Sequence, residues 1–387
     1  MNPFNTFFMG GFECADHINR SGERVNLLRE TQHDIRVEED YALLSELGIK
    51  VVREGICWSA VETSPGQFDF SEVLYRMLAA EKFGIQQIWD LIHFGYPDGL
   101  YPTHPKFCDR FVKLCQTFAV FYKANSRQQL FVVPINEISF LSWHSGDVRG
   151  TVPFAVNSGW DIKYHLCKAA IVGIQALKGV DPECRIVLVE PLVKIHSGPY
   201  TDPSQLFDLN EHQFQAMDII AGRICPELGG SESFLDILGF NYYWNCQWEA
   251  AAEPLLWPEL EMRRTPLNEL LHAAYHRYNK PIFLSETGHF GIGRVPWIEE
   301  VTAQCIEAKN KGVDFLGICI YPVTDRPDWD DLSSYSNCGI WDLDEEGNRI
   351  PETEVIDTIR KQQELIQLTP ATSLSGFCNT ITAMLWK

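Results

Sequence analysis

Two glutamates close short apolar runs in this chain of 387 residues, and both could take part in acid–base or nucleophilic chemistry. Glu137 directly follows the run at 130–136 (LFVVPIN), and Glu286 ends the run at 281–286 (PIFLSE). Two carboxyl groups that face each other can cleave a glycosidic bond, because one protonates the leaving oxygen while the other attacks the anomeric carbon. The pattern predicts this chemistry if the fold brings the ends of the two runs together.

Other polar side chains stand at the ends of similar runs. They are Arg53, His93, Asn136, Asn241, Tyr242 and Tyr243 and, in and after the last run, Tyr321, Asp325, Arg326, Asp328 and Trp329. We expect Arg53 to pair with ionised Glu286, whose negative charge would raise the pKa of Glu137. A single strand-end glutamate or histidine more often caps a helix or fills the core, but the joint arrangement favours catalysis.

The elements that must position these residues alternate along the chain. Runs rich in β-branched and aromatic residues lie at 7–12, 49–54, 85–93, 130–136, 185–190, 236–243, 281–286 and 314–321. Helical apolar spacing lies at 37–47, 70–83, 111–123, 164–177, 267–278 and 298–311. This alternation indicates parallel βα units. Eight repeats without a phosphate-binding glycine loop favour an α/β fold of the (β/α)8 TIM-barrel type over an open doubly wound sheet, with the site at the carboxyl ends of the strands.

The domain organisation follows from the same pass along the chain. Neither a linker nor an internal repeat is visible, so we predict a single barrel domain at 1–370. The segment 371–387 is predicted to be a peripheral C-terminal tail, although Phe377 and Trp386 suggest that it packs against the domain.

Composition excludes several classes of partner. The formal net charge is −20 and no run is rich in Lys or Arg, so nucleic acid and anionic membranes are disfavoured. The N-terminus lacks the features of a secretory signal, and the 12 Cys form no C-x-x-C motif, which indicates reduced thiols and a cytoplasmic location. Without H-E-x-x-H, P-loop or G-x-G-x-x-G motifs, we expect neither a metal nor a cofactor. The oligomeric state stays open.

Four motifs carry a resemblance to a known family. They are REGICW at 53–58, PINEIS at 134–139, DILGFNYYW at 236–244 and LSETG at 284–288. With these motifs the chain resembles the clan A retaining glycoside hydrolases, most closely family 1, which contains β-glucosidases and β-galactosidases. The resemblance covers nearly the whole chain, which is shorter than typical members.

The resemblance implies a retaining double displacement on a small β-glycoside, through a covalent glycosyl-enzyme intermediate. Glu286 would be the nucleophile and Glu137 the acid/base. The implied supporting residues are Arg53 and Tyr243 on the nucleophile, Asn136 on the sugar 2-hydroxyl, His93 on the sugar and Trp329 beneath the sugar ring. The choice of Tyr243 over Tyr242 rests on the resemblance, because adjacent strand residues point to opposite sides.

The chain departs from the family pattern at several positions. The family's sugar-gripping Gln is replaced by the stretch 13–17 (ECADH), its Glu before the platform Trp by Asp328, and the Asn after the nucleophile by Thr287. The family's Ser-x-Lys-x-Tyr element of 6-phosphosugar enzymes is missing after the last run, which argues against a 6-phosphosugar specialist. The sugar and the leaving group therefore stay open.

Three other functions compete with hydrolysis. A transglycosylase would use the same intermediate, and a non-catalytic carbohydrate-binding barrel is disfavoured because both carboxylates and their supporting Arg and Tyr are present. A metal-dependent barrel hydrolase would need a ligand cluster such as His-x-His, which the sequence lacks. Residues with two equal interpretations, in the site or in structural roles, are Trp143, Trp244, Trp248, Trp257 and Glu190, while Asp16 and His17 are weaker candidates for sugar contacts.

Overall fold

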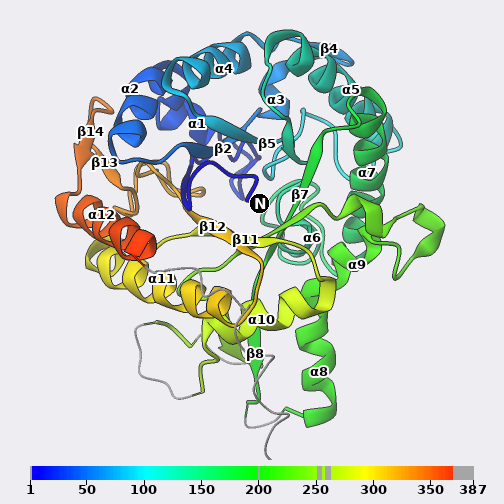
Figure 1. Cartoon of the computed structure of the whole chain (residues 1–387). Helices are drawn as coiled ribbons and strands as arrows, with labels where there is room; N and C mark the ends of the chain where they lie inside the picture. Colours follow the sequence, from blue (N-terminus) through cyan, green and yellow to red (C-terminus); the bar gives the residue numbers. More distant parts are fainter. Residues whose placement is uncertain (1, 199–200, 251–254, 258–262, 369–387) are drawn as a thin grey trace, which may run out of the picture.

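Parallel β-strands close into a barrel around the centre of the molecule in Figure 1, a computed structural model that describes residues 2–198, 201–250, 255–257 and 263–368. In chain order the barrel strands are β1 (Phe8–Gly11), β2 (Val51–Gly55), β5 (Gln86–Asp90), β6 (Phe131–Val133), β7 (Arg185–Pro191), β9 (Ile237–Asn241), β11 (Ile282–Thr287) and β12 (Phe315–Ile320). Each strand pairs in parallel with its neighbours, and β1 closes the barrel by pairing with both β2 and β12. The predicted single-domain (β/α)8 TIM barrel is confirmed.

Helices form a ring outside the strands (Figure 1). The longer ones are α2 (His33–Glu46), α4 (Ser71–Phe83), α5 (Phe107–Asn125), α7 (Gly159–Val180), α10 (Leu267–Tyr278), α11 (Arg294–Asn310) and α12 (Thr353–Leu368). The shorter ones are α1 (Leu27–Glu30), α3 (Trp58–Val61), α6 (Ile138–Gly146), α8 (Pro203–Glu211), α9 (Gln215–Ile220) and the 3-10 turns η1 (His212–Phe214), η2 (Pro226–Leu228), η3 (Glu232–Phe234) and η4 (Gly291–Gly293). Among the helices of the described residues, none is long and apolar enough to cross a membrane.

In the described part of the chain, three small strand pairs lie in the loops. They are β3 (Glu62–Ser64) with β4 (Gln67–Phe68), β8 (Lys194–His196) with β10 (Gln247–Glu249), and β13 (Trp341–Leu343) with β14 (Arg349–Pro351). The pair β8–β10 joins the loops that follow β7 and β9, so it shapes the rim of the barrel near the carboxyl ends of these strands.

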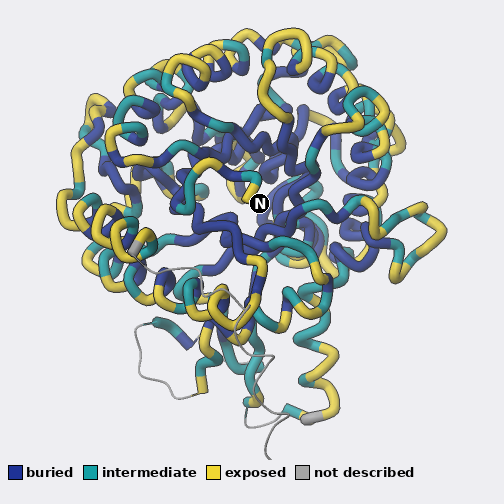
Figure 2. The backbone as a smooth tube through the Cα atoms, viewed as in Figure 1, coloured by how far each residue is buried: buried dark blue, intermediate teal, exposed yellow. Residues whose placement is uncertain are grey.

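Side chains alternate between the barrel interior and the helix layer. On β2, Val51 packs with the apolar residues inside the barrel, whereas Val52 packs in the larger core between strands and helices. Figure 2 shows the barrel strands buried and the outward surfaces of the helices exposed. Because successive strand residues point to opposite sides, Arg53 and Glu54 enter different environments although they are neighbours in sequence.

One glycine has a direct effect on the mouth of the barrel. A Cβ added at Gly11 would lie 2.1 Å from Cδ2 of Tyr321, so a side chain there would displace the aromatic ring. Glycine therefore allows Tyr321 to lie against the end of β1, from where its hydroxyl reaches the site.

Each of the eight predicted runs overlaps a barrel strand, but several strands end earlier than the runs. The run at 130–136 is a strand only to Val133, and the run at 85–93 only to Asp90. The remaining apolar residues continue into buried loop, which hydropathy does not distinguish from strand. The boundaries 1–370 and 371–387 stay predictions, and the tail lies outside the described residues.

Candidate active site

A cavity of about 1090 Å³ lies at the carboxyl ends of the barrel strands. The residues that line it include Glu137 after β6, Tyr243 after β9, Glu286 on β11 and Trp329 after β12. A cavity of this size at this end of a TIM barrel is the usual position of a ligand site. The structure therefore brings the two candidate carboxyl groups to one cavity.

Two side chains donate hydrogen bonds to the carboxyl group of Glu286. Its Oε1 accepts from Arg53 at 2.9 Å, and its Oε2 accepts from the hydroxyl of Tyr243 at 2.9 Å. Tyr242 lies elsewhere, stacked on Trp297 with ring centroids 5.8 Å apart. The side chain of Tyr243 is thus the one that points into the site, which is the orientation that the family resemblance implies.

Arg53 connects the nucleophile candidate to the rest of the site. It lies on β2, is 1% exposed, and also donates to Asp90 and, at 3.1 Å, to Oδ1 of Asn136. Burial by itself would lower the pKa of Arg53, but the charges of Asp90 and Glu286 outweigh it and raise the pKa. The guanidinium therefore stays charged and fixes three side chains at once.

Glu137 has a different environment from Glu286. Its backbone adopts the left-handed region, with φ 47° and ψ 58°, at the residue that precedes α6. Its Oε1 accepts from Nδ2 of Asn241 at 2.9 Å. Burial raises the pKa of Glu137 well above its usual range, and the negative charge of Glu286 raises it further. Such a carboxyl group keeps its proton near neutral pH and can act as an acid.

His93 lines the cavity, and Asn136 lies beside it, fully buried and outside the lining. His93 Nδ1 lies 2.9 Å from Asp90 Oδ2, while its Nε2 lies 3.3 Å from the hydroxyl of Tyr321 and 3.4 Å from Nδ2 of Asn136. Burial would lower the pKa of His93, but the hydrogen bond and charge of Asp90 raise it overall. The Asp90 contact orients the ring and leaves Nε2 toward the space that a ligand would occupy.

Trp329 forms one aromatic wall of the cavity. Its ring centroid lies 5.2 Å from that of Phe94 and 4.7 Å from that of His17, whose pKa burial lowers to about 3. His17 is therefore a neutral packing partner of Trp329. Asp16 instead accepts from the backbone of Ser59 at 3.0 Å, away from the cavity lining.

The other tryptophans divide between the cavity and the core. Trp143, Trp244 and Trp248 line the cavity. Trp257 is outside the lining and packs edge-on against Trp297, with ring centroids 5.1 Å apart. Asp328 is exposed and caps a turn, since its Oδ1 accepts from the backbone of Asp330 at 2.8 Å.

Glu190 lies behind α6. It is the penultimate residue of β7 and accepts from the backbone N–H of Ser139 at 3.1 Å. Burial raises its pKa to about 7. It does not line the cavity, so it acts on the site only through its charge and its contact with α6.

Sequence reasoning missed Asp90 and the pairing of Glu13 with Arg326. Asp90 supports both Arg53 and His93, and its signal is an acidic residue inside the apolar run at 85–93. Glu13 and Arg326 form an ion pair at 3.3 Å in the cavity, between the loops after β1 and β12. No pattern in the sequence links these two residues, because they are 313 positions apart in the chain.

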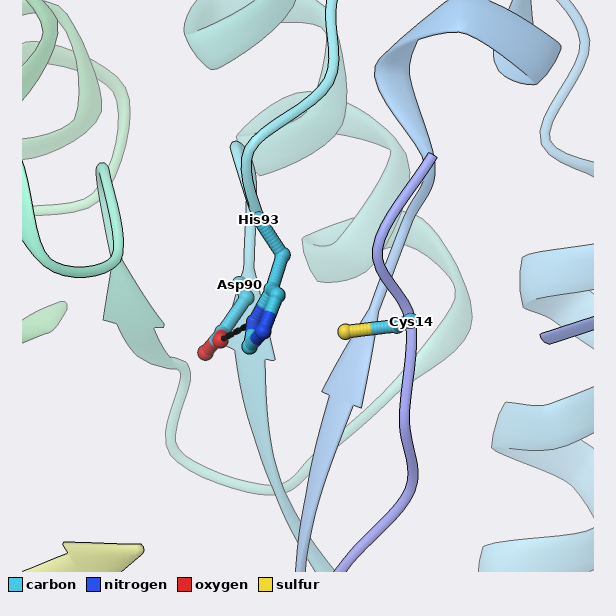
Figure 3. A group of neighbouring side chains, drawn as sticks. All are labelled: Cys14, Asp90 and His93. Carbon is cyan, nitrogen blue, oxygen red and sulfur yellow. Dashed lines mark hydrogen bonds and ion pairs between the residues drawn. The ribbon is translucent and has the colours of Figure 1, made fainter. Parts of the chain in front are cut away.

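Cys14, Asp90 and His93 place one potential metal-ligating atom each within 4.8 Å of one another. In Figure 3 the sulfur of Cys14 points toward the His93 ring, which is bonded to Asp90. Burial and the charge of Asp90 raise the pKa of the Cys14 thiol well above its usual range, so it stays protonated. Asp90 is also bound to the Arg53 guanidinium, which would repel a metal cation. The cluster fits a hydrogen-bonded support better than a metal centre.

No protein-family model matches the chain. Among curated proteins, 6-phospho-beta-glucosidase AscB of Escherichia coli (strain K12) is 24% identical over 310 residues, covering 65% of this chain and 64% of the relative, which is under two thirds of its length. Aryl-phospho-beta-D-glucosidase BglA of Bacillus subtilis (strain 168) is 22% identical, covering 80% of this chain and 76% of the relative.

Solved structures share the fold. The family 1 β-glucosidase from Thermotoga maritima superposes with a TM-score of 0.72 at 14% identity, covering 95% of this chain and 99% of that one. The β-glucosidase from the same organism in complex with azafagomine gives a TM-score of 0.70 at 15% identity, covering 87% of each chain. The chain is thus similar in fold to the family 1 β-glucosidases and, at low identity, similar in sequence to two phospho-β-glucosidases.

Proposed function

We propose that the protein is a retaining β-glycosidase that hydrolyses a small β-glycoside. The observation that carries this proposal is the contrast between two carboxyl groups in one cavity. Glu286 accepts from a guanidinium and a phenol, which suits an anionic nucleophile, whereas burial and the charge of Glu286 hold Glu137 protonated. These are the two protonation states that a double displacement needs at its start.

In the first step, Glu286 attacks the anomeric carbon while Glu137 gives its proton to the leaving oxygen. The bond to the aglycone breaks and a covalent glycosyl-enzyme ester forms. Glu137 is then a carboxylate and takes a proton from water, which attacks the anomeric carbon and releases Glu286. Arg53 and Tyr243 both contact the Glu286 carboxylate, so they would orient it for attack. They would also stabilise its negative charge when the ester is hydrolysed.

The sugar would occupy the half of the cavity near His93, Asn136 and Trp329. His93 Nε2 and Asn136 Nδ2 can hydrogen-bond hydroxyl groups, and the Trp329 ring offers an apolar face to the sugar. The curated relatives are named for 6-phospho-glucosides or aryl-phospho-glucosides. In this chain Arg326 is a cation on this side of the cavity, but the Glu13 carboxylate already pairs with it. Because the charge of Arg326 is balanced within the protein, this pairing favours an unphosphorylated sugar.

The test is a panel of nitrophenyl α- and β-glycosides, with and without a 6-phosphate, assayed with the wild type, Glu286→Ala and Glu137→Ala. We expect release from one β-sugar and a loss on the order of 10⁴-fold or more for Glu286→Ala. Proton NMR of the first-formed sugar should show the β-anomer, and a 2-deoxy-2-fluoro glycoside should label Glu286 in a digest. An α-anomer, or full activity of Glu286→Ala, would rule out the proposed mechanism.

A further inference from the structure

Lys163 differs from the other buried cations of the described residues. Each buried arginine forms an ion pair with a carboxylate: Arg53 with Glu286 and Asp90, Arg76 with Glu54, Arg294 with Asp342, and Arg349 with Asp40. Lys163 is only 9% exposed, yet within the described residues its Nζ has no carboxylate at ion-pair distance. Its one acceptor there is Oε1 of Gln215, at 2.9 Å.

With Gln215 as its acceptor in the described residues, Nζ of Lys163 can donate further hydrogen bonds to a ligand. An ammonium group has three N–H donors, and the amide of Gln215 is a neutral partner. A buried charge without a counter-ion is costly, and the cost falls when an anion binds. Burial correspondingly lowers the pKa of Lys163.

Lys163 lines the same cavity as the two carboxyl groups, on the side of Glu137. It lies in the first turns of α7, which packs on α6, the helix that begins directly after Glu137. The residues of α6 that share this side of the cavity are Ser139, Phe140 and Trp143. Because an acid/base group lies next to the leaving oxygen, this side of the cavity holds the aglycone, an assignment that rests on the proposed function.

Phe140 and Trp143 give this side an aromatic surface. They are one helical turn apart on α6, and their ring centroids lie 5.7 Å apart. Trp143 is 48% exposed although it is large and apolar. An exposed tryptophan at a cavity rim is suited to stacking on a flat ligand.

Glu190 and Asp147 are the carboxyl groups whose charges act on Lys163. Neither is within ion-pair distance of Nζ. Burial raises the pKa of Glu190 to about 7, so below that pH this group is neutral and an incoming anion meets little repulsion from it. The site can therefore accept a negative charge beside Lys163.

We propose that Lys163 is the anion-binding group of the leaving-group subsite, and that the substrate is a β-glycoside of an aromatic alcohol that carries a carboxylate or a phosphate. The ring would stack on Trp143 and Phe140, and the anion would bind Nζ of Lys163. The charge selected here is on the aglycone and not on the sugar.

The test uses product-like ligands, so it does not depend on turnover. Calorimetry would measure the Kd of 4-hydroxybenzoate, its methyl ester and 4-hydroxyphenyl phosphate with the wild type, Lys163→Gln and Lys163→Arg. Lys168→Gln, an exposed lysine of the same helix, is the matched control. We expect the wild type and Lys168→Gln to bind an anion at least about tenfold more tightly than the ester.

The ratio of the Kd of the ester to that of the acid separates the outcomes. A ratio that falls toward one in Lys163→Gln and is kept in Lys163→Arg supports the proposal, and the better anion identifies carboxylate or phosphate. A wild-type ratio near one overturns it, which needs no variant to fold. Unchanged discrimination in Lys163→Gln also overturns it.

The glycoside panel distinguishes this proposal from the proposed function. Anion binding through Lys163 in a protein that cleaves no glycoside would keep the anion site and overturn the hydrolase. Cleavage of neutral aryl β-glycosides by a wild type that binds acid and ester equally would keep the hydrolase and overturn the anion site.

Discussion

Glu54 and Glu137 are two buried carboxyl groups whose pKa values shift in opposite directions. Glu54, on β2, accepts from His33 at 2.9 Å, Arg76 at 2.8 Å and the Tyr41 hydroxyl at 2.5 Å. Burial would raise its pKa, but the charges of His33 and Arg76 outweigh burial and lower it to about 2. The Asn241 amide, which donates to Glu137, lowers the pKa of Glu137, but burial and the charge of Glu286 outweigh it and raise the pKa.

The comparison shows that burial alone does not decide the role of a carboxyl group. Glu54 belongs to an ion network behind the barrel wall, formed by Glu54, His33, Asp40, Arg76 and Arg349. This network joins β2 to α2, α4 and the β13–β14 pair, and each of its side chains has an ion-pair partner within it. At the barrel mouth, Glu137 is left short of donors, which keeps it protonated and reactive.

Substitution of Glu137 should produce the largest effect. Glu137→Gln keeps the shape of the neutral carboxyl group but cannot transfer a proton, so we expect kcat to fall by about 10²–10⁴-fold. The loss should be smaller for glycosides with acidic leaving groups. The free energy of unfolding of Glu137→Gln, measured in urea, should equal or exceed that of the wild type. A strongly destabilised variant would show that Glu137, like Glu54, has a structural role.

Substitution in the ion network should reverse this result. Arg76→Met leaves Glu54 without its guanidinium partner, so we expect a loss of about 3–5 kcal/mol in the free energy of unfolding. The kcat of the folded fraction should stay near the wild-type value. Arg360→Met, at an exposed pair, should cost under about 1 kcal/mol. A selective loss of kcat in Arg76→Met would contradict the separation of the two regions.

Acid should weaken the ion network in a defined pH window. The folded pKa of Glu54 is about 2 and its ordinary value is 4.5, so the folded state holds its proton more weakly than the unfolded state. Its contribution, about 3 kcal/mol, is present above pH 4.5 and lost as the pH falls toward 2. Unfolding measured from pH 6 to pH 3 should show a steeper loss for the wild type than for Glu54→Gln. Parallel curves would count against the charge pairing.

Glu190 should have a smaller influence on the site. Its negative charge contributes to the raised pKa of Glu137 once it ionises near pH 7. Glu190→Gln should therefore move the alkaline limb of the kcat/KM profile to lower pH, by less than about one unit. Glu183→Gln, exposed just before β7, is the control that should leave the limb in place. A shift to higher pH would show that another contact dominates.

Metal removal should have the smallest effect. Arg53 already neutralises Asp90 beside Cys14 and His93, so we expect a chelator to leave kcat unchanged. Loss of activity that zinc restores would show that the cluster holds a metal and would replace the two-carboxylate mechanism.

The sequence by itself determined the order of strands and helices and the residues at the strand ends. Local apolar spacing and short motifs were enough to predict the barrel and to select Glu137 and Glu286. The structure places His93, Tyr243 and Trp329 in the lining of the cavity, while Arg53 and Asn136 are buried outside the lining and contact residues in it. Their catalytic and binding roles stay predictions until the variants are measured.

Only the tertiary structure decided which charges meet. Asp90 supports Arg53 and His93, Glu13 pairs with Arg326, and Lys163 reaches the cavity from α7. Local spacing reports which face of one element is apolar, and it carries no information about which distant loop covers that element. The pKa of a buried group depends on donors and charges within a few ångströms, and in a closed barrel these come from strands far apart in the chain.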